Sequence, residues 1–382
     1  MASKGKKDKT AVKNRVCRFR IKPTAEQKEL FERTFGCVRR VYNLMLSDRK
    51  LHYEATGKDY SCTPAEYKGM YPYLAEVDSY ALCNAQVNLN RAYANFFAGR
   101  AGFPRFKSRR QGNPSYTTNV KKGTRNVALT DQGLILPKVG CVAIICHRPV
   151  PDGTLTAVTV TREADGAYYA ALLYELPDTP VAPATDPTNS IGLDMSLPHF
   201  FVDSDGHAAD YPRFYREAQA KLAKEQRRLS RMHKGSRNYQ DQLIKIGKLH
   251  AKTKHQRADF LNKLSFSLAE TYSLVCIEDL NMQNMSRSLK LGKSVMDNGW
   301  GMFVRMLAYK LADRGKTLLK VDRFFASSKT CLACGQKHTG LKLSDRIFVC
   351  PHCGHTIDRD YQAAINILNE GLRCYDRLIA PA

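Results

Sequence analysis

The sequence predicts an α/β multidomain fold, and three observations along its 382 residues carry that prediction. Residues 22–100 have helical periodicity, whereas residues 115–176 contain short runs typical of strands. After residue 190, apolar strand-like runs alternate with helical segments, and four cysteines in two C-x-x-C pairs lie among them. A hydrophobic content of 43% is enough to build a core in each part.

The first half begins with a strand followed by helices. Residues 1–15 are rich in lysine and are expected to be disordered. Val16–Ile21 alternates apolar and basic side chains, as a half-buried strand does. Thr24 and Gln27 have the spacing of a capping box, which predicts that a helix begins directly after Thr24.

A β-rich region and a linker follow. Five short runs between Gly, Pro and Asp turns predict a small barrel that the N-terminal strand would complete. These runs are Tyr116–Thr118, Leu134–Leu136, Val142–Cys146, Ala157–Thr161 and Tyr168–Tyr174. The prolines that follow predict a stiff linker over residues 181–189.

The second half alternates strands with helices. Ser190–Asp194 and Leu274–Glu278 are apolar strand-like runs that each end in a carboxylate, and a β-meander is expected over 199–211. Further predicted elements are helices over 213–254, around Phe260–Leu268, over Trp300–Ala312 and over 359–371, and a strand over Thr317–Val321.

The chain is strongly basic, with 60 Lys and Arg against 36 Asp and Glu and a net charge of +24. DNA or RNA is the natural partner of such an excess, because binding to phosphates releases counterions. Residues 213–254 carry 13 basic against three acidic residues, and basic residues interleave with aromatic ones over 102–110, although either could simply be solvated. The predicted nucleic-acid contacts are Arg105, Phe106, Lys107, Arg109, Arg110, Arg227, Arg228, Arg231, Lys234 and Arg237.

Neither a membrane nor an oxidising compartment is expected for this chain. No run approaches 18 apolar residues, and no apolar segment follows the basic N-terminus as in a signal peptide, which favours the cytoplasm. In that compartment twelve cysteines do not predict a disulfide framework. Eight are expected to be ordinary buried residues: Cys17, Cys37, Cys62, Cys83, Cys141, Cys146, Cys276 and Cys374.

The remaining four cysteines have the spacing of a zinc ribbon. Cys331 and Cys334 form one pair and Cys350 and Cys353 the other, with fifteen residues between the pairs. Each tight turn would offer two thiolates to one tetrahedral zinc ion. Four thiolates close the coordination shell, so this zinc is expected to be structural rather than catalytic.

Several carboxylates follow buried strands or begin a helix. Asp194 and Glu278 end apolar runs, and Asp358 and Asp360 begin the last helix. Burying an ionised carboxylate is costly unless a cation pairs with it. Converging carboxylates of this kind describe an RNase H-like nuclease site, where two divalent ions about 4 Å apart activate water. A turn cap, a lysine pair or a helix N-cap remains an alternative role for each of them.

Five ordered motifs resemble those of the TnpB family, transposon-encoded RNA-guided nucleases related to type V CRISPR effectors. The motifs are Phe35–Asn43, Gly102–Lys107, Ile191–Asp194, Ile277–Asn281 and the stretch Ser327–Ala364 that contains both cysteine pairs. The resemblance spans about residues 16–372. Two positions depart from the family pattern: Gln362 stands where Asn is usual, and Ser196 where a Gly-like residue is usual.

The resemblance implies an RNA-guided DNA endonuclease of an insertion sequence, in a bacterium and associated with the nucleoid. Asp194, Glu278 and Asp360 would be its RuvC-type catalytic residues, binding two Mg²⁺ or Mn²⁺ ions, with Asp358 left as the alternative to Asp360. A guide RNA from the transposon right end would pair with double-stranded target DNA beside a short adjacent motif. Base pairing by the RNA would read the target sequence, and the protein would read the adjacent motif, as in a different CRISPR protein.

The resemblance also implies a domain organisation. A basic tail (1–15) would precede an oligonucleotide-binding "wedge" barrel (16–21 and 101–180) interrupted by a helical recognition domain (22–100). The linker (181–189) would lead to an RNase H-like RuvC domain (190–326 and 356–382) that contains a zinc-ribbon insertion for target nucleic acid (327–355). Alternatives are an RNA-guided repressor without nuclease activity, a zinc-ribbon DNA-binding protein without guide RNA, and a miniature type V CRISPR effector.

Overall fold

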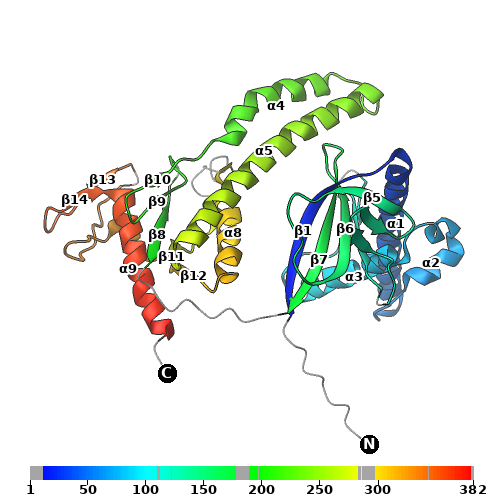
Figure 1. Ribbon diagram of the computed structural model, residues 1–382, viewed down its shortest axis with the longest axis horizontal. Helices are drawn as coiled ribbons and strands as arrows, with labels where there is room; N and C mark the ends of the chain where they lie inside the picture. The colour runs from blue at the N-terminus through cyan, green and yellow to red at the C-terminus, as the bar shows by residue number, and fades with distance from the viewer. Residues whose placement is uncertain are drawn as a thin grey trace, which may run out of the picture. The chain divides into compact units, whose positions relative to one another are not determined.

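The computed structural model (Figure 1) describes residues 12–109, 112–121, 123–177, 189–196, 198–282, 285, 297–342 and 344–379. The chain divides into two compact units. The first comprises Met1–Thr179 and Lys234–Lys248, and the second Pro180–His233 and Leu249–Ala382. The predicted tail up to residue 11, most of the predicted linker, and Arg110 lie outside the described residues.

Helices follow the N-terminal strand of the first unit, as predicted. They are α1 (Ala25–Thr56), α2 (Pro64–Met70), the 3₁₀ helix η1 (Pro72–Ala75) and α3 (Ser79–Phe97). The capping box at the start of α1 is present. The Thr24 hydroxyl accepts a hydrogen bond from the Gln27 backbone N–H at 3.3 Å, and the Gln27 side chain accepts one from the Thr24 N–H at 3.0 Å.

Seven strands of the first unit form one sheet. They are β1 (Val12–Lys22), β2 (Ser115–Asn119), β3 (Ala128–Thr130), β4 (Gly133–Leu136), β5 (Gly140–Ile145), β6 (Thr154–Arg162) and β7 (Tyr168–Pro177), in the order β2-β6-β7-β1-β5-β4-β3. The N-terminal strand β1 lies between β7 and β5 and is antiparallel to both. Figure 1 shows it beside β7. Strand β3 was not predicted because three residues are too few to show alternation.

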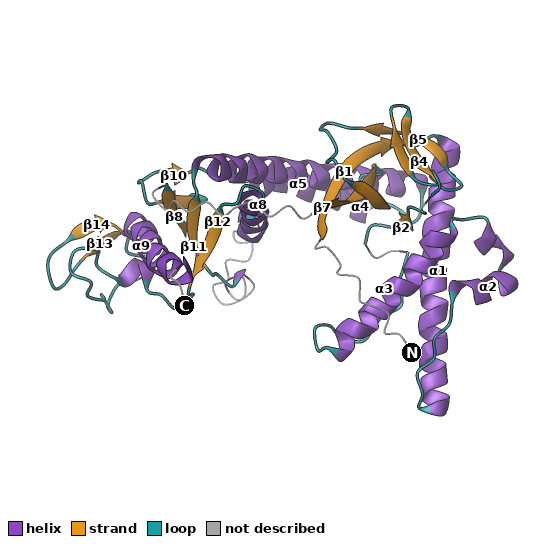
Figure 2. Ribbon diagram, turned by 60° about the horizontal axis from the view of Figure 1, so that its bottom comes forward, coloured by secondary structure: helices purple, strands orange, loops and turns teal. Residues whose placement is uncertain are grey.

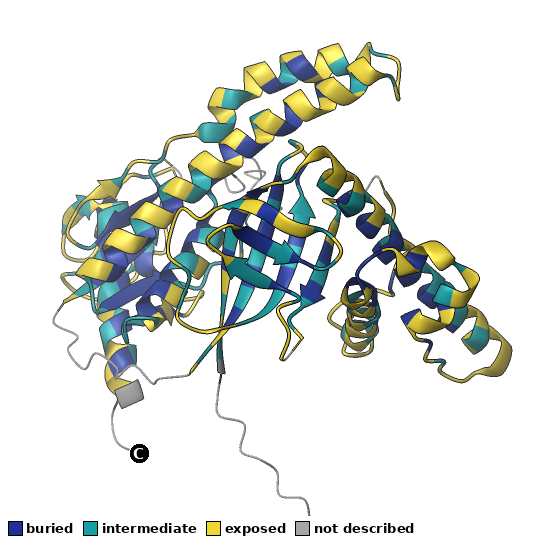
Figure 3. Cartoon of the chain, turned by 45° about the vertical axis from the view of Figure 1, so that its right-hand side comes forward, coloured by how far each residue is buried: buried dark blue, intermediate teal, exposed yellow. Residues whose placement is uncertain are grey.

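The helices and the sheet of the first unit share one hydrophobic core. Residues of β7 alternate between buried and half-buried, and the same striping is visible across the sheet in Figure 3. Phe31 of α1 lies at ring-centroid distances of 6.1 Å from Tyr116 and 5.6 Å from Tyr168, which belong to two different strands. The helical segment is therefore packed on the sheet rather than separate from it.

The second unit is built on a five-stranded mixed sheet. Its strands are β8 (Ser190–Met195), β9 (Phe201–Asp203), β10 (Ala208–Ala209), β11 (Leu274–Glu278) and β12 (Thr317–Val321), in the order β10-β9-β8-β11-β12. Strands β8, β11 and β12 are parallel, and β9 and β10 continue the sheet antiparallel. The helices of this unit are α4 (Phe214–Ser230), α8 (Trp300–Ala312), α9 (Arg359–Ile379) and the part of α5 (Arg237–Thr271) from Leu249 onward.

Successive residues along the central strands point to opposite faces of this sheet. Helix α9 lies on one face, and α5 and α8 lie on the other (Figure 2). Ile191 and Leu193 of β8 share a core with residues of α5 and α8. Leu274 and Cys276 of β11 instead pack with residues of α9. Since successive residues alternate between faces, Gly192 lies on the α9 face, and Asp194 and Glu278 continue that same face.

The long basic segment is helical, as predicted, and the structure adds where it divides. Helices were expected over 213–254 and around Phe260–Leu268; α4 ends at Ser230, and α5 runs unbroken from Arg237 to Thr271. The break occurs at Gly235, whose φ of 91° an α-helix does not allow. The Ser236 hydroxyl then accepts a hydrogen bond from the Tyr239 N–H at 3.1 Å, as an N-cap does.

Two smaller expectations also changed. The last helix, predicted over 359–371, extends to Ile379. Cys83, Cys141 and Cys146 were expected to be buried but are exposed, whereas Cys17, Cys37, Cys62 and Cys276 are buried and Cys374 is half-buried. Within the described part of the chain, no helix is both long and apolar enough to cross a membrane.

Candidate functional site

Asp194 and Glu278 lie next to each other at one edge of the second sheet. The parallel register pairs Cys276 with Gly192 and Ile277 with Leu193. The next residue on each strand is one of the two carboxylates, so both project toward α9 from neighbouring strand ends. The prediction that these two chain segments converge is therefore met by the register of β8 and β11.

Glycine at position 192 allows α9 to approach β8 closely. A Cβ atom at Gly192 would lie 2.2 Å from the Ala364 carbonyl oxygen and 2.8 Å from the Leu368 backbone nitrogen. Neither distance is compatible with a side chain. The small residue thus brings the N-terminal turn of α9, which carries Asp360, to the edge of the sheet where Asp194 and Glu278 lie.

Asp358 and Asp360 have different positions at the start of α9. The Asp358 carboxylate accepts hydrogen bonds from the backbone N–H groups of Asp360 and Tyr361, both at 2.9 Å, and therefore caps the helix. Asp360 lines the same pocket as Asp194 and Glu278. Ser196, one of the two departures from the family pattern, hydrogen-bonds the Asp360 carboxylate at 3.4 Å.

The three carboxylates line a pocket of about 690 Å³. Burial raises the pKa of Asp194 well above its ordinary value, and the negative charges of Glu278 and Asp360 raise it further. Burial also raises the pKa of Glu278, although a hydrogen bond from Ser327 partly opposes that shift. Carboxyl groups so placed repel one another when ionised, and bound cations would relieve the repulsion.

Cationic side chains complete the lining of this pocket. The Arg359 guanidinium pairs with Asp360 at 2.9 Å, and Arg346 of the cysteine-containing segment pairs with it at 3.6 Å. Lys329 and Lys342 also line the pocket. Sequence reasoning missed all four residues, and only their position inside the cysteine-containing motifs could have suggested them.

The donors in the pocket fit divalent cations that prefer oxygen ligands. Three carboxylates from β8, β11 and α9 meet in one pocket, and burial followed by the charges of Glu278 and Asp360 raises the pKa of Asp194. Mg²⁺ is bound in proteins by a few carboxylates together with water and substrate phosphates. Asp194, Glu278 and Asp360 would hold such ions.

The four cysteines form a group that could hold a metal ion. Their sulfur atoms all lie within 4.8 Å of one another. The Sγ atoms of Cys331 and Cys353 are 3.7 Å apart, and those of Cys334 and Cys350 are 3.6 Å apart. A tetrahedron with Zn–S bonds of about 2.3 Å has edges of about 3.8 Å, so these separations fit zinc.

Both cysteine pairs lie on turns of the same construction. The Gly335 N–H donates to the Cys331 carbonyl and the Gly354 N–H to the Cys350 carbonyl, each at 3.0 Å. The two glycines have φ values of 72° and 75°, a conformation that glycine adopts readily. Both turns lie in the segment between η2 (Ser327–Lys329) and α9. The second turn connects the antiparallel strands β13 (Ile347–Val349) and β14 (Thr356–Asp358).

The structure brings together the two motifs of the first half. The Asn43 side chain makes hydrogen bonds of 2.8 and 3.0 Å with the backbone of Lys107. The Lys107 ammonium lies 4.1 Å from the centre of the Tyr42 ring, and desolvation lowers its pKa. A pocket of about 370 Å³ is lined by the predicted contacts Arg105, Phe106, Lys107 and Arg109, together with Arg39.

The other predicted nucleic-acid contacts are exposed. Arg227 and Arg228 lie in the last turn of α4, Arg231 and Lys234 follow it, and Arg237 begins α5. None of these five side chains forms an ion pair with a described residue. They are therefore available for phosphate groups, and their contact with nucleic acid stays a prediction.

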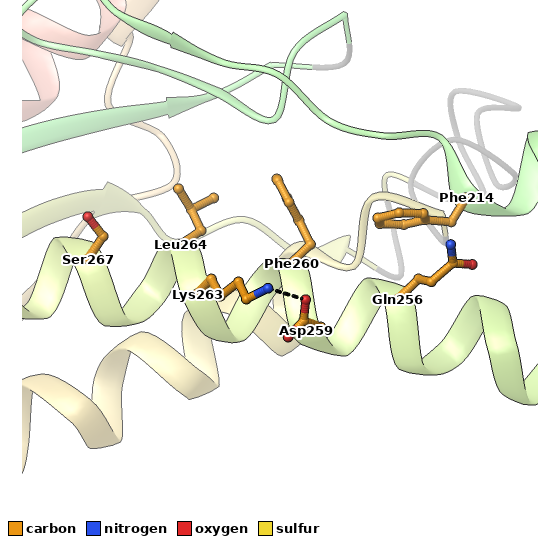
Figure 4. Close-up of a pocket in the computed structure, with 7 residues that line it drawn as sticks. All are labelled: Phe214, Gln256, Asp259, Phe260, Lys263, Leu264 and Ser267. Carbon is orange, nitrogen blue, oxygen red and sulfur yellow. Dashed lines mark ion pairs between the residues drawn. The ribbon is translucent and has the colours of Figure 1, made fainter.

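A further pocket of about 610 Å³ lies along α5 and has a mainly apolar lining (Figure 4). Phe214, Phe260 and Leu264 point into it, and Lys263 pairs with Asp259 at 2.7 Å on its rim. None of the three candidate catalytic carboxylates lines this pocket.

Three family models match successive parts of the chain. A helix-turn-helix domain model of the IS605 OrfB group matches residues 13–58, which in this structure comprise β1 and α1. The IS605 OrfB model, described as a probable transposase, matches residues 171–289. A Cas12f1-like TNB domain model matches residues 300–367, including all four metal-site cysteines.

Several curated relatives match nearly the whole chain, and two of them are more than 30% identical to it. A Streptomyces pristinaespiralis protein named "Putative RNA-guided DNA endonuclease" is 38% identical over 94% of this chain and 89% of its own length. The Escherichia coli K12 protein InsQ, named in the same way, is 32% identical over 93% of this chain and 91% of its own. The chain therefore belongs to the TnpB-like family of RNA-guided DNA endonucleases.

A solved structure shares the fold. Cas12f1, determined in complex with guide RNA and target DNA, aligns with a TM-score of 0.57 and 12% identity, covering 94% of this chain and 99% of that one. At this identity the likeness concerns the fold alone.

Proposed function

We propose that this protein is an RNA-guided endonuclease that cleaves double-stranded DNA next to a short transposon-adjacent motif. The observation that carries the proposal is the convergence of Asp194, Glu278 and Asp360 in one pocket at the edge of the second sheet. Relatives that are alike over nearly the whole chain bear the name of RNA-guided DNA endonucleases. Carboxylates arranged in this way suit two-metal phosphodiester hydrolysis.

The second unit would be the RNase H-like RuvC nuclease domain. The parallel strands β8, β11 and β12, extended by antiparallel β9 and β10, support this assignment. The cysteine-containing segment is inserted between β12 and α9 and would bind zinc. In the first unit, the sheet and its packed helices would correspond to the wedge and the recognition domain.

Residues of this pocket would hold the catalytic cations and attract the phosphodiester. Asp194, Glu278 and Asp360 would hold two Mg²⁺ ions, or Mn²⁺, which when bound activate water and stabilise the leaving oxygen. Lys329 and Lys342 are placed to attract the phosphodiester into the pocket. The ion pairs of Asp360 with Arg346 and Arg359 would weaken when cations bind, because the carboxylate would then share its charge with them.

The basic residues outside the pocket would bind nucleic acid. A guide RNA from the transposon right end and the target DNA are the proposed partners. The exposed cations between α4 and α5 suit phosphate contacts, and Phe106 beside Arg105 suits base stacking. Base pairing by the guide would then select the target sequence.

Sequencing the RNA that copurifies with the protein tests this function. We expect one discrete RNA species, Mg²⁺-dependent cleavage of DNA that matches its variable end, and loss of that cleavage after ribonuclease treatment. DNA binding that survives ribonuclease would instead indicate a zinc-ribbon DNA-binding protein. Guide-dependent binding without cleavage would indicate a repressor. A guide encoded by a CRISPR array would indicate a type V effector.

A further inference from the structure

The buried Ser327 contacts Glu278, one of the three carboxylates, although the two residues belong to different sequence motifs. Ser327 lies in the 3₁₀ helix η2, 49 residues after Glu278 in the sequence, and is only 5% exposed. Its hydroxyl donates a short hydrogen bond to the Glu278 Oε1 atom. That bond uses one lone pair of Oε1 and leaves the other lone pairs of the carboxylate for an ion.

The short helix that carries Ser327 is itself fixed by α9. The Asn366 side chain, 6% exposed, donates hydrogen bonds to the carbonyl oxygens of Ser327 at 2.7 Å and of Thr330 at 2.8 Å. Asn366 lies on the same helix as Asp360. A continuous set of hydrogen bonds therefore runs from α9 through η2 to the end of β11.

We propose that Ser327 is a positioning residue, which holds Glu278 in the orientation that binds the catalytic cations, and that Asn366 keeps Ser327 in place. The proposal rests on the proposed nuclease function. A glutamate at a strand end has three side-chain torsions, and its carboxylate would otherwise sample several rotamers. The hydrogen bond from Ser327 selects one of them before an ion arrives.

The same short helix adjoins the cysteine group. Thr330, whose carbonyl Asn366 binds, is followed directly by Cys331. The Thr330 hydroxyl donates to the Ala326 carbonyl at 2.9 Å, which closes the turn around Ser327. A zinc ion at the cysteines would thereby help to fix η2, and with it Glu278.

Divalent-ion binding by the full-length, RNA-loaded protein tests the role of Ser327. Electron paramagnetic resonance counts bound Mn²⁺ directly, and the Mg²⁺ concentration for half-maximal cleavage is measured on the same samples. We expect Ser327→Ala to weaken Mn²⁺ binding and to raise that Mg²⁺ concentration about 10–100-fold, as is usual when a partner of a metal ligand is removed. Ser327→Thr keeps the hydroxyl and should recover most of the loss.

Two further variants separate positioning from folding. Ser344→Ala removes an exposed serine hydroxyl that, among the described residues, hydrogen-bonds only Asp345, at 3.3 Å, and should leave Mn²⁺ affinity unchanged. Asn366→Ala leaves Ser327 itself intact but frees η2, and should weaken Mn²⁺ binding in the same direction. Melting temperature and zinc content, measured on every variant, show whether the chain remains folded.

The outcomes distinguish this inference from the proposed function. If the wild-type protein binds no Mn²⁺ and cuts no guide-matched DNA, the proposed function fails. If the wild type does both and folded Ser327→Ala matches it in Mn²⁺ affinity, only the positioning role is overturned. Equal losses in Ser327→Ala and Ser327→Thr would also overturn it, because the hydroxyl would then be irrelevant.

Discussion

Replacing Gly192 by alanine should displace the third carboxylate without touching any of the three. The added Cβ would lie 2.2 Å from the Ala364 carbonyl oxygen and 2.9 Å from the Leu368 Cβ, where ordinary contacts begin at about 3.4 Å. Helix α9 must therefore move away from β8 by about 1 Å. A misplacement of that size can reduce a reaction rate about 100-fold.

The assay compares cleavage of a guide-matched plasmid by Gly192→Ala and by the wild type, with the melting temperature recorded for both. Overpacking should also cost about 1–3 kcal/mol of unfolding free energy. Gly301→Ala is the matched control, because a Cβ there meets nothing within 4 Å and alanine favours the helical conformation of α8. Wild-type cleavage and stability in Gly192→Ala would refute the close approach of α9 and the reasoning built on it.

Three further predictions concern the metal sites and the carboxylates. Cys331→Ser should lower the zinc content measured by atomic absorption and reduce cleavage at least about tenfold; full cleavage would refute the coupling between the cysteine group and Glu278. Asp358→Ala removes the helix cap and should lower the free energy of unfolding by about 1 kcal/mol, measured by thermal unfolding. It should retain cleavage, whereas Asp360→Ala should abolish it. An equal loss of cleavage in both variants would place Asp358 in the catalytic group. Without divalent ions, Asp194→Asn should melt at a higher temperature than wild type at neutral pH. Burial and the neighbouring carboxylates raise the pKa of Asp194, so the folded chain binds its proton more tightly than the unfolded chain does. Wild-type stability therefore falls as pH rises from about 3.9 through the raised pKa, and an unchanged melting temperature in Asp194→Asn would contradict this repulsion.

Local sequence patterns predicted most elements of the fold. The capping box at Thr24 and the apolar runs that end at Asp194 and Glu278 depend on neighbouring residues, which a sequence displays directly. The break between α4 and α5 contains Gly235, which has a φ of 91°. One glycine in a basic segment was too weak a signal to predict where the helix ends. Cys141 is exposed because of which face of β5 the rest of the protein covers. The amino-acid composition does not show which face that is.

In the candidate site, too, local features could be predicted from the sequence, whereas contacts between distant residues could not. The residue pattern singled out Asp194, Glu278 and two aspartates at the start of the last helix, and the resemblance implied their catalytic role. The sequence alone could not separate a helix cap from a pocket residue. Backbone hydrogen bonds identify Asp358 as the cap. Ser327 escaped notice because its contact with Glu278 joins residues 49 positions apart, and no periodicity reports such a distance.

Cleavage of guide-matched plasmid DNA by the RNA-loaded protein in Mg²⁺ tests the central claim most directly, with Asp194→Ala compared against the wild type. The wild type should cut, and Asp194→Ala should bind the same RNA and DNA with unchanged affinity while cutting nothing. Cleavage by Asp194→Ala at the wild-type rate would contradict the assignment of Asp194, Glu278 and Asp360 as the catalytic site.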